Sequence, residues 1–276
     1  MAETVTFVTS DDPPQTITVA RAPLVAPASS KVFADILSIP LDATAAQESI
    51  RLDETHAEVK DFLALLSGVE PIDALSDLEW ESLARCADKY DSLVGRIAAQ
   101  TRVWKLLAQR DSKRSLHAFT LATLLNDHPL IEATAKTAGS RWNRRREAFR
   151  ATEDWKQRLD NYVNRCKCLA YSEMVSYDFE GHFCGGSSDC SQGHALYAWQ
   201  HLFRRAMETF NIEAPFYDPY IHLSWSDERG YDHDRFQDDA PEGCMCQEHR
   251  VAMWDASQQV EDVYQAQYKR TRFFSQ

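Results

Sequence analysis

The stretch from Thr4 to Val19, TVTFVTSDDPPQTITV, decides the fold class at the amino end of the chain. Polar and apolar residues alternate over 4–9 and again over 15–19, which is typical of strands with one buried face. The Ser-Asp-Asp-Pro-Pro between the two runs is a turn sequence. We therefore predict a β-hairpin of two short strands that buries Val5 and Phe7.

Helical patterns dominate the sequence that follows. One face of a helix that should end before Pro40 carries Val32, Phe33, Ile36 and Leu37. Ile50 and Leu52 alternate again as a third short strand. Two capping boxes then predict helix starts, Thr55-x-x-Glu58 and Ser76-x-x-Glu79. Apolar residues recur at i, i+3, i+4 and i+7 after each box, and Gly68 is placed to end the first helix.

Three more helical stretches follow in the first half. One carries Val94, Ile97, Ala98 and Thr101, another runs from Leu116 to Leu124, and the third passes Pro129 and reaches Ala138. We expect each of these apolar stripes to pack into a core. The fold class predicted is α+β, with a small sheet flanked by helices at the amino end and a mainly helical region with Cys/His-rich loops after it.

Four segments in this order resemble a BTB/POZ domain, most closely those of fungal proteins. They are Ser30–Leu37, Ile50–Glu54, Phe62–Gly68 and the most specific one, Ala87-Asp88-Lys89-Tyr90. The resemblance covers about residues 3–100 and implies dimerisation or partner recruitment. BTB domains commonly carry an Asp in the first strand and a His after the second, where this chain has Thr4 and Ala20. The usual dimer is therefore not implied.

The resemblance suggests a division of the chain into three parts. Residues 1–100 form the BTB/POZ-like domain, residues 101–140 a helical extension, and residues 141–276 a helical Cys/His-rich domain. In that last part, a helical face carries Leu159, Tyr162, Val163 and Cys166, and a later one carries Val260, Val263 and Tyr264. Cys166 on such a face can be a small buried residue instead of a ligand.

Six of the seven cysteines lie between Cys166 and Cys246. Thiolates and imidazoles suit zinc, and short spacings let one loop supply two ligands. Our hypothesis is one structural Zn²⁺ bound by Cys184, Cys190, Cys244 and Cys246, with reserve ligands His249, His194, His182, Cys166 and Cys168. Reduced thiols without metal, and redox-sensitive cysteines, are the alternatives.

The charge balance bears on the partners. The chain has 30 Lys+Arg against 42 Asp+Glu, a formal net charge of −12, which disfavours general attraction to nucleic acid or an anionic membrane. Arg141–Arg150 holds the one concentration of basic residues. It leaves open a nucleic-acid-linked regulator that contacts phosphates through this patch, against the plainer interpretation of a solvated helix face.

No motif for catalysis occurs: the sequence lacks G-x-S-x-G, GxxxxGK[ST], H-E-x-x-H and the Rossmann fingerprint. We expect a non-enzymatic protein-interaction adaptor, with a zinc-dependent hydrolase as a third possibility. The partner is a protein, either a second copy or, by family resemblance, a cullin-type scaffold. Neither a signal peptide nor a long apolar span is evident in the sequence, so a cytoplasmic or nuclear protein is expected.

Overall fold

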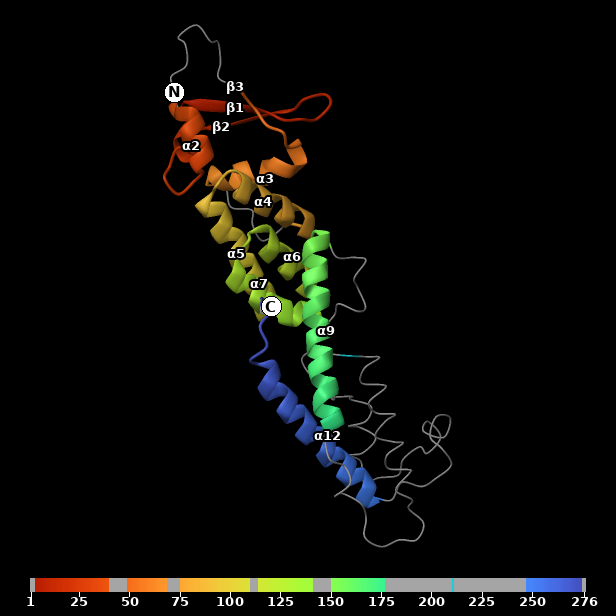
Figure 1. Cartoon of the computed structure of the whole chain (residues 1–276). Helices are drawn as coiled ribbons and strands as arrows, with labels where there is room; N and C mark the ends of the chain where they lie inside the picture. The colour runs from red at the N-terminus through yellow and green to blue at the C-terminus, as the bar shows by residue number, and fades with distance from the viewer. Residues whose placement is uncertain are drawn as a thin grey trace. The chain divides into compact units, whose positions relative to one another are not determined.

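The computed structural model describes residues 3–39, 49–68, 75–109, 114–140, 150–176, 210 and 247–274; for 247–257 it describes the backbone alone. The described residues form a mixed α+β structure, with a three-stranded sheet near the amino end and helices in the rest (Figure 1). This confirms the predicted α+β class. Among the described residues, no helix is long and apolar enough to cross a membrane.

The predicted hairpin is present. Strands β1 (Thr4–Val8) and β2 (Thr16–Ala20) are antiparallel, with Val5 opposite Val19 and Phe7 opposite Ile17. Strand β3 (Ser49–Arg51) runs parallel to β1 on its other side, which gives the order β2-β1-β3. The third strand is therefore also confirmed.

The hairpin turn is tied to the rest of the first half by the Asp11 carboxylate and by the Ser10 N–H, which donates to the Glu54 carbonyl at 2.9 Å. Asp11 Oδ2 accepts hydrogen bonds from Thr9 Oγ1 at 2.5 Å and from the His56 N–H at 2.7 Å. These two bonds, the Thr9 one first, lower the pKa of Asp11 below its ordinary value, because they favour the charged form. The turn and the start of the next long helix are thus held together.

Two short helices, α1 (Arg21–Leu24) and α2 (Lys31–Ser38), follow the hairpin. Ser30 caps α2 by accepting the Phe33 N–H at 3.1 Å, and α2 ends before Pro40 as predicted. Helices α3 (His56–Leu66) and α4 (Asp77–Lys89) both begin with the predicted capping boxes. Gly68, just beyond α3, has a φ of +78°, the left-handed conformation that glycine adopts without strain.

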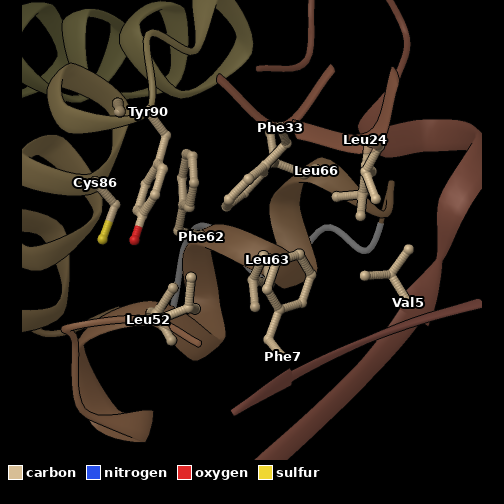
Figure 2. Close-up of a cluster of buried hydrophobic side chains, with 13 residues drawn as sticks. Val5, Phe7, Leu24, Phe33, Leu52, Phe62, Leu63, Leu66, Cys86 and Tyr90 are labelled. Carbon is tan, nitrogen blue, oxygen red and sulfur yellow. The ribbon is translucent and has the colours of Figure 1, made fainter. Parts of the chain in front are cut away.

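The core of this part lies between the sheet and helices α2, α3 and α4 (Figure 2). Phe33 is at its centre: its ring centroid is 5.1 Å from that of Phe7, 6.4 Å from Phe62 and 4.6 Å from Tyr90. Burying such side chains contributes roughly 1.5–3 kcal/mol each relative to leaving them exposed. Val5, Phe7, Phe33 and Phe62 are fully buried.

Helix α5 (Leu93–Ala108) follows the expected core stripe only in part, and Val94 is the residue of that stripe that packs against the core. Its buried residues are Gly95, Ala99, Val103 and Leu106, whereas Ile97 and Thr101 of the predicted core stripe are exposed. The physical reason is close helix packing. A Cβ added at Gly95 would lie 2.7 Å from Ala87 Cβ on α4, so this turn of α5 can approach α4 so closely only with Gly95 on the inner face.

Helices α6 (Ser115–Leu124) and α7 (His128–Gly139) complete the first half, and α6 is buried along almost its whole length. The chain divides into two compact units, Met1–Ala138 with Glu147–Trp155, and Gly139–Arg146 with Lys156–Gln276. The sheet and helices α1 to α6 all belong to the first unit. The separate extension over residues 101–140 stays a prediction.

In the second unit the described elements are most of α9 (Glu153–Ser176) and α12 (Gln247–Tyr268). The predicted face of α9 is confirmed: Leu159, Tyr162, Val163 and Cys166 are buried. Val260 and Tyr264 of α12 are buried too, but Val263 is about half exposed. Beyond α12, the main-chain carbonyl of Phe273 accepts a hydrogen bond from Arg165 Nη2 at 2.8 Å, which ties the end of the chain to α9.

Candidate interaction surface

The Ala-Asp-Lys-Tyr segment at the end of α4 joins the sheet to the helices. The hydroxyl of Tyr90 donates to Glu54 Oε2 at 2.5 Å, and its main-chain carbonyl accepts from Ser30 Oγ at 2.7 Å. Lys89 Nζ lies 2.5 Å from Glu54 Oε1 and 3.2 Å from Asp53 Oδ2. The ring of Tyr90 is buried beside Phe33, so Tyr90 has a structural role, whereas Asp88 and Lys89 of the same segment are exposed.

The same contacts determine the pKa values of the ionisable side chains at the end of α4. Burial, followed by the Glu54 carboxylate, raises the pKa of Tyr90 well above its ordinary value, so the phenol keeps its proton and stays a donor. The hydrogen bond to Glu54 raises the pKa of Lys89, which therefore stays charged. The buried thiol of Cys86 has its pKa raised to about 12, first by burial and then by Glu54 and Glu58. A thiol of this kind is a poor nucleophile.

A buried polar cluster that sequence reasoning missed joins α4 to α6. His117 Nδ1 lies 3.4 Å from Glu81 Oε1, and His117 Nε2 lies 3.5 Å from Asp77 Oδ1. Glu81 has a 4% exposed side chain and is also approached by Arg85 at 3.7 Å and Arg150 at 3.8 Å. The sequence signal for it was weak, namely a histidine as the one ionisable residue of α6.

This cluster does not have the geometry of a catalytic site. Each imidazole nitrogen faces a carboxylate, so neither is directed at a hydroxyl or thiol nucleophile. The two carboxylates also lie at opposite nitrogens of the ring, and no group of three His, Cys, Asp or Glu side chains suited to a metal occurs within the described ranges. The cluster is a set of buried polar contacts between two helices, and neither ring nitrogen of His117 has a hydrogen-bond partner within the described ranges.

The outer face of α5 is the surface feature with the clearest capacity for binding. Five uncharged residues recur along it with spacings of 4, 4, 3 and 4, and all are exposed: Leu93, Ile97, Thr101, Trp104 and Ala108. We call this set the α5 stripe. Leu93 is 54% exposed, Ile97 51% and Trp104 55%. At ~100° per residue the five lie within about 80° of one another around the helix axis.

The one hydroxyl in the α5 stripe is already satisfied. Thr101 Oγ1 donates to the Ile97 carbonyl at 2.8 Å within the helix. A partner that excludes water from this surface therefore does not have to break a hydrogen bond of this hydroxyl. From residue 93 to residue 108 the stripe is ~22 Å long at 1.5 Å per residue. This length and spacing match the apolar seam along which a second helix packs.

The four predicted zinc ligands, Cys184, Cys190, Cys244 and Cys246, lie outside the described residues, as do the reserve ligands His182 and His194. His249 is on α12, where the backbone alone is described. The other two reserve ligands are on α9: Cys166 is fully buried, and Cys168 is exposed. Cys166 shares a hydrogen bond with Tyr264, whose pKa is raised first by burial and then by Cys166.

The basic patch is also largely outside the described residues, because 141–149 are not among them. Its last member, Arg150, is half exposed, and its Nη1 atom lies 3.8 Å from Glu81 Oε1. That guanidinium is therefore engaged with a protein carboxylate in the first unit. A comparison of this chain with family models, with curated proteins and with solved structures found no match.

Proposed function

We propose that the protein is an adaptor for protein–protein interaction, in which the first unit recruits a helix of a partner protein through the α5 stripe. The observation that carries this proposal is the exposure of Leu93, Ile97 and Trp104 on one face of one helix. A contiguous set of half-exposed large apolar side chains on a soluble surface marks an interaction site. A single exposed leucine would not support it.

The rigidity of α5 adds to the proposal. Its opposite face is fixed against α4 by the close approach of Gly95 to Ala87, and Ala99 and Val103 are fully buried. The helix therefore cannot rotate to hide the α5 stripe without losing that packing. Because the stripe is preorganised, a partner need not supply the free energy to order it.

The chemistry of the stripe specifies the kind of partner. Apolar residues at helical spacing, with Trp104 as the one aromatic residue among them, suit an amphipathic helix that lays its own apolar face along α5. Trp is enriched at the energetic centres of interfaces, because one side chain buries a large area with little loss of rotamer freedom. By the BTB/POZ resemblance, a cullin-type scaffold is the first partner to test.

We further propose that a structural Zn²⁺ bound by Cys184, Cys190, Cys244 and Cys246 holds the second unit together. The support is the donor set, since four thiolates make a closed tetrahedral site that leaves no position for water. Elemental analysis of the purified protein should then find about one zinc per chain, released together with helical content by a strong chelator. A zinc content near zero without chelator exposure would remove this part of the proposal.

The adaptor proposal is tested with a matched pair of substitutions. Ile97→Asp places a charge in the middle of the α5 stripe, and Leu78→Asp places the same charge on α4 at a side chain that is similarly exposed, 57% against 51%. With a purified cullin amino-terminal domain as the probe, we expect micromolar binding by the wild type. Ile97→Asp should weaken this binding more than about tenfold, and Leu78→Asp should change it less than about twofold.

The outcomes separate the parts of the proposal. No binding by the wild type at tens of micromolar would remove the cullin-type partner. Equal weakening by both variants would show that the added charge, and not its position, matters, and would remove the α5 stripe as the recruitment surface. Both variants should first be shown to unfold at the wild-type temperature, because the replaced side chains are exposed.

A further inference from the structure

The outer edge of strand β2 presents backbone groups that the sheet does not use. In the β1–β2 ladder, the Thr9 N–H donates to the Gln15 carbonyl and the Arg21 N–H donates to the Glu3 carbonyl, both at 2.9 Å. Hydrogen-bonded pairs alternate along an antiparallel ladder, so residues 15, 17, 19 and 21 bond to β1. The N–H and C=O groups of Thr16, Thr18 and Ala20 consequently point away from β1.

Nothing in the described part of the chain covers this edge. Strand β2 is the last strand of the order β2-β1-β3, and no described residue forms a hydrogen bond with the outward groups of Thr16, Thr18 or Ala20. Thr16 and Thr18 are exposed. The edge also lacks the usual protection, since residues 15–20 contain no charge and no proline.

The apolar face of the same strand is only partly covered. Val5 and Phe7 on the central strand are fully buried, whereas Ile17 and Val19, on the same face and packed against the same core, remain partly exposed. A further strand beside β2 would cover them, provided that it placed apolar side chains on this face.

We infer that the open edge of β2 pairs with β2 of a second copy of this chain, antiparallel, about a two-fold axis at Thr18. This register is the one in which all three outward residues are paired: Thr18 with Thr18 of the other copy, and Thr16 with Ala20 in both directions. Three such pairs with two hydrogen bonds each give six bonds. The nearest alternative registers are shifted by two residues, since only alternate residues have outward groups, and each of them loses one pair because Pro14 has no N–H and α1 begins at Arg21.

The side chains of this register are complementary. Ile17 of each copy lies opposite Val19 of the other on the core face, so each covers the partly exposed flank described above. On the other face, Thr6 Oγ1 and Thr18 Oγ1 are 3.2 Å apart, and pairing at Thr18 extends this contact into a row of four threonines across the two copies. The result is one continuous six-stranded sheet with a small interface, so we expect a dissociation constant in the micromolar range.

The inference rests on the proposed adaptor function, because it adds self-association to partner recruitment, and it uses a different surface from the α5 stripe. The test is the solution mass of the full chain by sedimentation equilibrium from 1 to 200 μM. The mass should rise from 31.5 kDa toward twice that value. A mass that stays at 31.5 kDa overturns the inference but leaves the α5 experiment unaffected.

Substitutions at the two-fold position test the register. Thr18→Lys and Thr18→Glu should each be monomeric, since like charges then face each other across the axis, and an equimolar mixture of the two should recover the dimer. Thr18→Pro removes the outward N–H without removing a hydrogen bond to β1, and should also weaken dimerisation at least tenfold. Thr6→Lys adds the same charge to the same face of the central strand and serves as the control that keeps the dimer.

Each outcome has a definite consequence. Dimers that persist in all three Thr18 variants, or a Lys and Glu mixture that fails to pair, overturn the β2 register. Thermal unfolding of each variant shows that the strand is intact, because the Thr18 N–H takes no part in the ladder to β1.

Discussion

Replacing Gly95 by alanine sets two effects of known size against each other. Alanine in place of glycine inside a helix normally stabilises a protein by roughly 0.5–1 kcal/mol. At this position the added methyl would lie 2.7 Å from Ala87 Cβ and 3.1 Å from Phe62 Cε2. Overpacking costs about 1–3 kcal/mol, and a contact this short, between two methyl groups attached directly to helix backbones, belongs at the upper end. We expect a net loss of ~2 kcal/mol.

The assay is thermal and urea unfolding followed by circular dichroism. For a chain of this size a loss of ~2 kcal/mol lowers the melting temperature by about 4–8 °C. Ala87→Gly removes the methyl group that Gly95→Ala would strike, so the double variant should be more stable than the sum of the two single changes by at least ~1 kcal/mol. Additive effects, or a Gly95→Ala protein as stable as the wild type, would refute the close packing of α4 and α5.

Three other outcomes follow from the first unit. Tyr90→Phe removes the hydroxyl that donates to Glu54 and should cost about 1.5–3 kcal/mol, measured by urea unfolding; a variant as stable as the wild type would contradict the contribution of this hydrogen bond. Because the pKa of Cys86 is about 12 and its side chain is buried, iodoacetamide at pH 8 should label Cys168 long before Cys86, as peptide mass spectrometry would show; equal rates would contradict the burial. The hydrogen bonds from Thr55 lower the pKa of Glu58, so the folded protein binds its proton less readily than the unfolded chain. The stabilising effect of the Glu58 carboxylate is present above pH ~5 and is lost as the pH falls through the lowered pKa. Glu58→Gln should therefore reduce the loss of stability at acid pH in a plot of unfolding free energy against pH. An acid branch of that plot identical to the wild type would refute this.

The parts of the fold that were predictable depend on local sequence. The hairpin follows from alternation around a Pro-Pro turn, and the starts of α3 and α4 follow from capping boxes closed within four residues. These contacts need no knowledge of the rest of the molecule. The Glu81–His117 contact joins residues 36 positions apart on two helices, so no local sequence pattern predicts it.

The orientation of α5 could not be predicted, because the usual rule ranks residues by the apolar area they bury. By that rule Ile97 should be buried, and Gly95, which has no side chain, gives no indication of which face is buried. In the structure, close packing against α4 selects the face with small residues, since a shorter distance between helix backbones brings many atoms into contact at once. Leu93, Ile97 and Trp104 are consequently exposed, while Val103 and Leu106 are buried on the inner face.

This inversion is why α5 carries the functional proposal. If α5 buried Leu93, Ile97 and Trp104 instead, the core would bury more apolar surface. The outer face would then hold no apolar residues to bind a partner. Leaving Leu93, Ile97 and Trp104 half exposed costs solubility and gains no stability in the isolated chain, so folding alone does not account for them. The same reasoning applies to β2, where an uncharged edge is a liability in a monomer. An exposed apolar stripe and an uncharged sheet edge are both unfavourable in a monomer. A partner helix would cover the α5 stripe, and a partner strand would cover the edge of β2.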